Sequence, residues 1–503
     1  MRTGTRRAAA TASGLARKPF GWTFTAPLYV GSSLNAINST IIATALVPIA
    51  AELHVPVGST AVLITSLYLA SAVAQPTAGK LAEVFGARRI FLAGIVLVLF
   101  GGLVGGLGRN LAMLTVARVL VGIGTSAAFP CAMVLIRRRA DEVGLDTPPG
   151  GVLGGLAIAG MATAAVGPPI GGLLVGTAGW RWAFLINIPV TVIAMAVAVR
   201  WLPKDPVPPG DPVPPGDPAN PAPGRGQNRF VELAGRIDLP GILGFAASMS
   251  ALVVFLTGLP QVRWAALAAF VLVAVPTVVW ELRKASPFFD FRGLAANGAL
   301  ARTYLRQALI LLGVYSVMYG MTQWMEAAHG LSTLEAGLLL LPMGAMSALF
   351  SRPLARRNLV RGPLIASALT MLVGSVGIML LTSHSPAIAI VLVTLVFGIT
   401  TATTTVGNQT ALYLAAPPDQ IGTASGLLRT CGYLGSITSA VIGSLVFRDG
   451  ASDHGLHVLG LVLVVAGLAA LLLAVFDRRL MARGTSRPAA RASRTPNAKE
   501  TPA

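Results

Sequence analysis

Long apolar stretches, separated by short polar segments, follow one another along most of this 503-residue chain. An α-helix needs roughly 20 apolar residues to cross the ~30 Å hydrocarbon core of a membrane, and many of these stretches have that length. Of all residues, 54% are hydrophobic and 11% are charged, whereas soluble domains carry roughly 25% charged residues. The chain therefore lacks the polar surface of a water-soluble protein, and we predict an all-α integral membrane protein.

Fourteen stretches are long enough to be transmembrane helices. They are predicted at 26–50, 58–80, 90–108, 112–136, 150–174, 181–202, 239–259, 264–282, 303–324, 333–351, 362–382, 386–412, 421–447 and 456–476. The first is too long for a cleaved signal peptide, so we expect it to remain as a helix.

The positions of the basic residues predict the orientation of these helices. With a cytoplasmic N-terminus, the basic clusters all fall on the cytoplasmic side: Arg88-Arg89, Arg137-Arg138-Arg139, Arg283-Lys284, Arg356-Arg357 and Arg478-Arg479. The opposite loops carry only the single arginines Arg109, Arg181, Arg263 and Arg448. Because Lys and Arg collect in cytoplasmic loops, we expect a multi-pass protein of the plasma membrane with both termini in the cytoplasm. Orientation also explains the net charge of +19, since no basic face interleaved with aromatic residues predicts a nucleic-acid partner.

Two long polar segments, 203–238 and 477–503, follow the predicted helices at 181–202 and 456–476. The first contains the sequence DPVPPG twice in tandem and is expected to be an extended linker, because proline without an apolar face cannot form a core. The predicted parts are a basic cytoplasmic N-terminus (1–25), a six-helix bundle (26–202), a cytoplasmic linker (203–238), an inserted helix pair (239–282), a cytoplasmic loop (283–302), a second six-helix bundle (303–476) and a disordered basic tail (477–503).

The sequence predicts neither a metal site nor a cofactor. Cys131 and Cys431 lie in separate apolar stretches, without metal-ligand spacing or a disulfide framework. The predicted spans contain no Walker loop, H-E-x-x-H sequence, nucleophile elbow or haem-binding pair, which argues against an enzyme. The segments outside the membrane are too small for a sensor domain, which argues against a receptor.

The loop between the second and third predicted helices reads GKLAEVFGARR at residues 79–89. It resembles the signature loop of the major facilitator superfamily, G-x-L-a-D-r-x-G-r-k, with Glu83 in place of the usual aspartate. Gly79 and Gly86 allow tight turns and close helix approach, while Glu83 can pair with Arg88 and Arg89 at the membrane surface. A basic loop that only orients the protein is the alternative.

The fourth and fifth predicted helices carry two further motifs. Arg118 lies in RVLVGIG, which is similar to the superfamily motif R-x-x-q-G-x-g; an arginine that snorkels to the interface is the alternative. Five residues match an antiporter signature, G-x8-G-x3-G-P-x2-G-G, in which Thr163 replaces the second glycine: Gly154, Gly167, Pro168, Gly171 and Gly172. An ordinary packing face of small residues is the alternative for that helix.

Two more segments resemble the fourteen-span drug:proton antiporters of the QacA/EmrB type. They are GWRWAFLINIP at 179–189 and ASGL at 424–427 followed by Arg429. The resemblance implies two pseudo-symmetric bundles plus an inserted pair, alternating access around a central cavity, and export of lipophilic compounds in exchange for protons. It also implies small-molecule and proton partners within a lipid bilayer, and we expect a monomer to function.

The first predicted helix departs from that family. Its members usually carry L-D-x-T-I-V-N there, whereas this chain has Asn38 in place of the membrane-embedded aspartate. An amide does not titrate, so the usual proton site is missing at that position. We therefore predict Arg118 as a coupling residue, assisted by Glu326 near the end of the ninth helix. Glu326 as a solvated loop carboxylate is the alternative.

Polar side chains inside predicted spans need partners, either on neighbouring helices or in a wet cavity. The predicted cavity residues are Asn35, Asn38, Gln323, Thr403, Thr404, Asn408 and Gln409. Interhelical hydrogen bonding is an equal alternative for each. The sequence thus favours a proton-coupled exporter of lipophilic small molecules such as antibiotics, with an uncoupled facilitator or importer of a neutral solute as the alternative.

Overall fold

The computed structural model of the chain describes residues 19–55, 60, 62–145, 147–205, 238–258, 262–284, 287–331, 333–357, 359–448 and 450–477. Every regular element in these residues is a helix. Most of the predicted N-terminal segment, of the DPVPPG linker and of the C-terminal tail lies outside the described residues.

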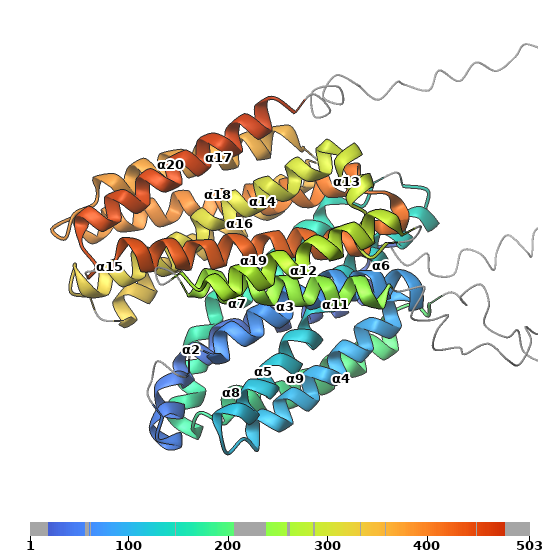
Figure 1. Cartoon of the computed structure of the whole chain (residues 1–503), viewed down its shortest axis with the longest axis horizontal. Helices are drawn as coiled ribbons and strands as arrows, with labels where there is room; N and C mark the ends of the chain where they lie inside the picture. Colours follow the sequence, from blue (N-terminus) through green and yellow to red (C-terminus); the bar gives the residue numbers. More distant parts are fainter. Residues whose placement is uncertain are drawn as a thin grey trace, which may run out of the picture.

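The first group of helices packs together as one layer of the molecule, drawn blue to green in Figure 1. It comprises α2 (Trp22–Leu53), α3 (Val62–Phe85), α4 (Ala87–Gly106), α5 (Leu111–Ser126), α6 (Ala128–Glu142), α7 (Gly150–Ala178), α8 (Trp182–Leu185) and α9 (Asn187–Trp201). The α5 and α6 helices follow one another as a single 32-residue apolar span, and α8 and α9 as a span of 20 residues.

A second group, drawn yellow to red in Figure 1, packs against the first. It comprises α14 (Gly298–Ser316), the π-helical turn η2 (Val317–Met321), α15 (Thr322–Ala327), α16 (Thr333–Arg356), α17 (Arg361–Leu380), α18 (Ala387–Ala415), the short η3 (Pro418–Gln420), α19 (Ile421–Val446) and α20 (Asp453–Val475).

A helical hairpin lies between the two groups in the sequence. It consists of α11 (Leu239–Thr257) and α12 (Trp264–Arg283), and a short helix, α13 (Phe291–Ala296), follows it. The α11 helix contacts both α3 and α19, one helix from each group. The α12 helix packs mainly on α11 and presents exposed apolar side chains such as Leu272, Val275 and Trp264. Such a surface suits contact with lipid chains rather than with water.

Eleven helices among the described residues are long and apolar enough to cross a membrane, or up to twelve if the bent α2 is one span. The chain is therefore an all-helical multi-pass protein, but this number does not confirm the predicted fourteen. Of the predicted spans, α7 and α19 are the helices outside this set. The α19 helix carries many Gly, Ser and Thr residues because most of it packs inside the protein instead of facing lipid.

Several predicted helix ends were wrong by a few residues. The span predicted at 112–136 runs on through Arg137, Arg138 and Arg139 to Glu142, because a helix can continue beyond the apolar layer into polar sequence. The helix predicted from 303 begins at Gly298, where the Asn297 side chain accepts a hydrogen bond from the amide of Leu300. Part of the loop predicted at 283–302 is thus helical.

The α2 helix is bent by 46° between Trp22–Ile42 and Thr44–Leu53. Pro48 lies four residues beyond the start of the second segment. A proline lacks the amide that would bond to the carbonyl four residues earlier, so the helix bends in the preceding turn.

Candidate functional site

The end of the molecule that carries Arg88, Arg89 and the α6 arginines is here called the arginine end; it lies at the right of Figure 1. At this end the signature loop joins the two helix groups. The Glu83 carboxylate accepts hydrogen bonds from the Thr423 amide (2.7 Å) and from the Thr423 hydroxyl (2.9 Å) at the start of α19. The acid of the motif therefore contacts the opposite helix group rather than Arg88 or Arg89.

The α3 and α19 helices touch backbone to backbone next to this contact. A Cβ atom added to Gly422 would lie 2.6 Å from the Gly79 carbonyl oxygen, and one added to Gly426 would lie 2.5 Å from the Gln75 carbonyl oxygen. Further along, the Thr430 hydroxyl donates to the Ala72 carbonyl oxygen at 2.7 Å. These contacts hold the two helix groups together from the arginine end towards the middle of the molecule.

Sequence reasoning missed Asp205, which was assigned to the extended linker. Its carboxylate accepts hydrogen bonds from the backbone amides of Arg88 (3.0 Å) and Arg89 (2.9 Å) in the first turn of α4, and Arg138 lies 3.4 Å away. Gly86 precedes these amides with a φ of +100°, a conformation that favours glycine. The start of α4 thus binds an acid from the linker, and no sequence signal separated Asp205 from the rest of the DPVPPG repeat that it begins.

Arg118 lies inside the first helix group. Its side chain is 2% exposed. Its Nε donates to the Leu63 carbonyl oxygen at 2.8 Å and its Nη1 to the Asn38 carbonyl oxygen at 3.0 Å. The guanidinium therefore lies between α2, α3 and α5, held by backbone carbonyls and not by a carboxylate. Tyr68 of α3 lies near it.

The side chain of Asn38 is bonded within the same helix group. Its Nδ2 donates to Asn187 Oδ1 at 2.7 Å and to the Leu34 carbonyl oxygen at 2.9 Å, while Asn187 Nδ2 donates back at 2.9 Å. Asn38 and Asn187 thus form a reciprocal amide pair between α2 and α9. Sequence reasoning included Asn187 in a family motif without expecting this contact.

Four tyrosines meet in the interior where the two helix groups face each other. This central tyrosine cluster comprises Tyr68 of α3, Tyr315 of α14, Tyr319 of η2 and Tyr433 of α19. The hydroxyls of Tyr68 and Tyr319 lie 3.2 Å apart, and the rings of Tyr68 and Tyr433 are 5.8 Å apart. Tyr315 and Tyr319 are stacked, with ring centroids 5.7 Å apart. A π-helical turn such as η2 often occurs at functional sites.

Amide side chains extend this cluster. Tyr433 donates to Asn35 Oδ1 at 2.9 Å and accepts from Gln75 Nε2 at 3.1 Å. Asn35 in turn donates to the Thr125 hydroxyl oxygen at 3.0 Å. Of the predicted cavity residues, Asn35 therefore lies at the boundary between the helix groups. The tyrosines and Gln75 were missed because their positions on separate helices carry no motif.

The predicted cavity residues of α18 lie inside the second helix group. Asn408 Nδ2 donates to Gln307 Oε1 of α14 at 2.8 Å, and Thr403 bonds within its own helix. The oxygens Thr404 Oγ1, Asn408 Oδ1 and Gln409 Oε1 are buried without a hydrogen-bond partner. Buried polar atoms are almost always bonded to protein or water, so these oxygens mark a place for water or a polar ligand group.

Gln323 and Glu326 lie on the short α15, which directly follows the η2 turn that carries Tyr319. Gln323 is exposed and Glu326 is half-buried. Among the described residues, no hydrogen bond or ion pair joins either side chain to Arg118 or to the tyrosine cluster.

The glycine motif of α7 packs against α2. Cβ atoms added to Gly167 or Gly171 would meet the hydroxyls of Thr40 and Thr44 respectively. Gly154 is also buried, whereas Gly172 is exposed and has open space beside it. Pro168 lies within α7, and its side chain is outside the described set. The small residues therefore allow a close approach of α7 to α2, and Gly172 does not take part in it.

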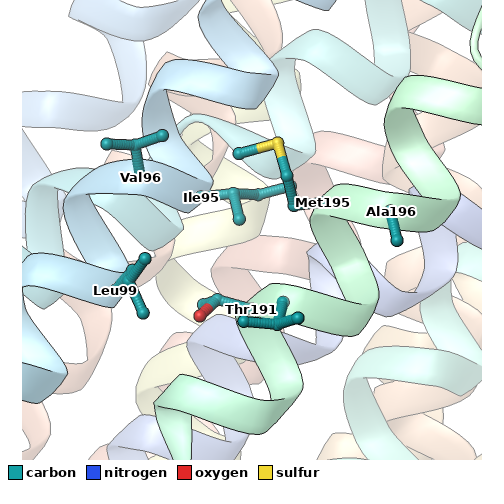
Figure 2. A pocket seen from close by; sticks show the side chains of 7 residues that line it. Ile95, Val96, Leu99, Thr191, Met195 and Ala196 are labelled. Atoms are coloured by element: carbon teal, nitrogen blue, oxygen red, sulfur yellow. The ribbon is translucent and has the colours of Figure 1, made fainter.

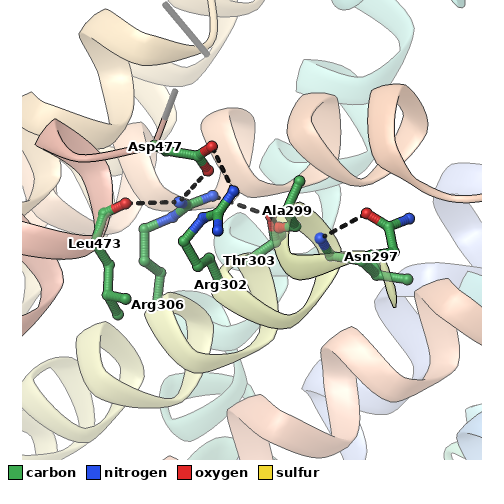
Figure 3. Close-up of polar contacts among 8 residues, drawn as sticks. Asn297, Ala299, Arg302, Thr303, Arg306, Leu473 and Asp477 are labelled. Carbon is green, nitrogen blue, oxygen red and sulfur yellow. Dashed lines mark hydrogen bonds and ion pairs between the residues drawn. The ribbon is translucent and has the colours of Figure 1, made fainter. Parts of the chain in front are cut away.

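A buried ion-pair cluster ties the end of α20 to α14 (Figure 3). Asp477 lies 2.8 Å from Arg302 and 3.5 Å from Arg306, and Arg306 also donates to the Thr303 hydroxyl oxygen at 3.0 Å. The side chains of Asp477 and Arg306 are 1% and 2% exposed. Asp477 is the first residue of the predicted tail (477–503), and these two arginines hold it.

Replacing Asp477 with asparagine is expected to lower the free energy of unfolding by about 3 kcal/mol, because it leaves the charge of Arg306 buried without its partner. Thermal unfolding of the purified protein in detergent measures this effect. Asp141→Asn is the control, since Asp141 is half-exposed in its pair with Arg137 and the expected change is below about 0.5 kcal/mol. Equal midpoints for the two variants would contradict the prediction.

An apolar groove of about 250 Å³ lies between α4 and α9, away from the predicted cavity residues. Figure 2 shows the side chains that line it, among them Ile95, Leu99 and Met195. Its apolar lining suits a lipid chain better than a polar substrate.

Comparison with known proteins agrees with this architecture. A family model described as Major Facilitator Superfamily matches residues 28–440. The uncharacterized MFS-type transporter YwoD of Bacillus subtilis (strain 168) is 31% identical over 456 residues, covering 90% of this chain and 96% of that protein. The tetracenomycin C resistance and export protein of Streptomyces glaucescens is 28% identical over 452 residues, 86% of this chain and 77% of that protein. The multidrug resistance protein Stp of Mycobacterium tuberculosis (strain CDC 1551 / Oshkosh) is 28% identical over 395 residues, 76% of this chain and 68% of that protein.

Two solved structures share the fold. The human organic anion transporter MFSD10 (TETRAN) matches with a TM-score of 0.61 and 14% identity, covering 89% of this chain and 99% of that chain. The proton:xylose symporter XylE matches with a TM-score of 0.62 and 13% identity, covering 91% of this chain and 95% of that chain. This protein is a transporter and not an enzyme, and it belongs to the major facilitator superfamily.

Proposed function

We propose that the protein is a fourteen-span, proton-coupled exporter of lipophilic small molecules that works by alternating access. The observation that carries this proposal is the central tyrosine cluster. Side chains from both helix groups meet there, next to the buried Arg118, at a place where a substrate would contact both groups at once. Export relatives such as the tetracenomycin C resistance and export protein support the direction and the substrate class.

The fourteen proposed spans are the twelve helices that are long and apolar enough, with the bent α2 counted as one span, together with α7 and α19. With 29 and 26 residues, both helices are longer than the roughly 20 residues that a crossing requires. The polarity of α19 is compatible with a span because most of its Ser and Thr side chains are buried inside the protein, where lipid does not contact them. We propose the division predicted from the sequence, with six-helix bundles at 26–202 and 303–476 and an inserted helix pair at 239–282.

The proposed transport cycle depends on the contacts between α3 and α19. These contacts close the arginine end, and the protein must break them to open that end to its side of the membrane. We propose that this side is the cytoplasm and that the described conformation is closed towards it. Arg118 is the proposed coupling residue, and Glu326 the proposed assisting acid.

Efflux of a neutral fluorescent lipophile, such as Nile red, from energised cells tests the function. Cells that produce the protein should accumulate less dye than cells without it, and a protonophore should abolish the difference. Dye exclusion that survives the protonophore would contradict proton coupling. Equal accumulation in both cell types would contradict export of this class of compound, and it is the result expected of the uncoupled facilitator.

Both termini and the linker are expected in the cytoplasm of the producing cell, because the arginine clusters orient the chain that way. Reporter fusions in the linker and at the C-terminus measure this directly. A reporter signal from the outer side at either place would contradict the fourteen-span topology, because one span more or fewer reverses every later loop.

Neutral or weakly charged compounds are expected to be better substrates than dications. No described carboxylate contacts the tyrosine cluster, and desolvating a dication without a counter-charge is costly. Growth protection against neutral, monocationic and dicationic toxic compounds measures this preference, and strong protection against dications would contradict it.

Asn38→Asp is the matched variant for this test. An oxygen in place of Asn38 Nδ2 would face the acceptor oxygens of Leu34 and Asn187, so the new carboxyl is expected to keep a proton there and to recruit no dication. A gain of protection against dications in this variant would show that the acid is ionised.

A further inference from the structure

Arg429 stands out among the buried arginines. It lies eight residues into α19, about 12 Å along the helix axis from its start. Its guanidinium carbon lies 4.0 Å from the centroid of the Phe129 ring, which belongs to α6 of the other helix group. Within the described part of the chain, no hydrogen bond or ion pair of this guanidinium is found. By contrast, Arg118 and Arg306 both have hydrogen-bond partners.

The surroundings of Arg429 leave it reachable. Protein atoms surround the side chain densely, yet it is only half-buried, so part of its surface remains accessible. The titratable groups near it are Tyr433 and Tyr315, two members of the central tyrosine cluster. The planar group thus has Phe129 against one side and phenol rings nearby.

A guanidinium without an anion or a hydrogen-bond acceptor is costly inside a membrane protein. Its five N–H donors fit a carboxylate in a bidentate, charge-assisted pair. The aromatic side chains around it fit a flat ring. Together these features favour an aromatic ligand that carries one acidic group.

We propose that Arg429 binds the carboxylate of aromatic, monoanionic substrates, whose ring lies against the central tyrosine cluster. This inference rests on the proposed function and narrows its substrate class to lipophilic acids. It assigns Arg118 and Arg429 different tasks, since Arg118 is bonded to carbonyl groups of its own helix group whereas Arg429 is free to bind a ligand.

Binding of 2-naphthoate and of its neutral amide, 2-naphthamide, to the full-length protein in lipid nanodiscs tests the proposal. Isothermal titration calorimetry is expected to show that the acid binds about tenfold more tightly than the amide, as one charge-assisted pair can provide. Arg429→Gln should abolish this preference and leave amide binding nearly unchanged. Arg429→Lys should keep part of it, because lysine retains the charge but not the planar fork.

Arg109→Gln is the matched control, because Arg109 is exposed in the loop before α5 and should not affect either affinity. Equal affinities for acid and amide, or an acid preference that survives Arg429→Gln, would overturn the proposal. Absence of acid binding to the unmodified protein would also overturn it, whether or not the amide binds. Binding is measured without a proton gradient, so a failure to observe coupled efflux would not change the measured preference for the acid. Conversely, loss of the acid preference would not contradict export of neutral compounds.

Discussion

Replacing Arg118 with alanine is expected to reduce uphill efflux to the level of cells that lack the protein. The guanidinium is a buried charge at the junction of α2, α3 and α5, near Tyr68 of the central tyrosine cluster. Its loss leaves the carbonyl oxygens of Leu63 and Asn38 without their donors. It also removes the positive charge that, in the proposed mechanism, couples proton movement to transport. Nile red efflux from energised cells measures the effect, with the amount of protein in the membrane determined in parallel.

Downhill and uphill dye transport together distinguish a coupling role of Arg118 from a purely structural one. If the arginine couples transport to protons, the alanine variant should still equilibrate dye down its concentration gradient in proteoliposomes while failing to move it uphill. Arg109→Ala is the control, because it removes an exposed arginine of the same helix end and should leave uphill efflux unchanged. Proton-driven efflux at the normal rate in Arg118→Ala would show that coupling does not need this residue.

Gly426→Ala is expected to prevent closure of the arginine end. The added Cβ would lie 2.5 Å from the Gln75 carbonyl oxygen and from the Pro76 Cα atom, and neither backbone atom can move without shifting α3. Overpacking of this kind costs roughly 1–3 kcal/mol, which shifts a two-state equilibrium about 5- to 150-fold. The closed state should lose population by this factor, and efflux should fall with it.

Maleimide labelling of a cysteine at position 423 measures closure, in a background without Cys131 and Cys431. Labelling should be slow in the parent protein, because Thr423 contacts Glu83, and fast after Gly426→Ala. Gly443→Ala is the matched control in the same helix, since a Cβ there has open space. Equal labelling rates in the two glycine variants would contradict a closing role for the α3–α19 contact.

The sequence predicted the membrane helices well because each helix satisfies its own backbone hydrogen bonds. In lipid this requirement is strict, so a run of about 20 apolar residues suffices to predict a span. The same reasoning was less accurate at helix ends. Residues Arg137 to Glu142 are polar yet helical, and residues 298–302 continue the helix beyond the apolar sequence.

The site was predicted only in part. Arg118 is buried and Asn35 lies at the boundary between the helix groups, whereas Glu83 bonds to Thr423 instead of pairing with Arg88 or Arg89. Tyr68, Gln75, Tyr319 and Tyr433 carry no motif, because a single aromatic or amide side chain within a span does not reveal which face of the helix it occupies. Gln323 and Glu326, which the sequence grouped with the site, lie on the short α15, which directly follows the η2 turn that carries Tyr319.

The sequence by itself therefore determined that this protein is an all-helical membrane protein, since composition and local periodicity act over one helix at a time; its transport function was implied by motifs that resemble the major facilitator superfamily. Only the tertiary structure decided which polar groups meet. Glu83 bonds to Thr423, Asn38 to Asn187 and Asp205 to the start of α4, across separations of more than 100 residues. Such pairs depend on how each helix is rotated and how closely its neighbours approach, and these properties arise from packing of the whole bundle rather than from any single stretch of sequence.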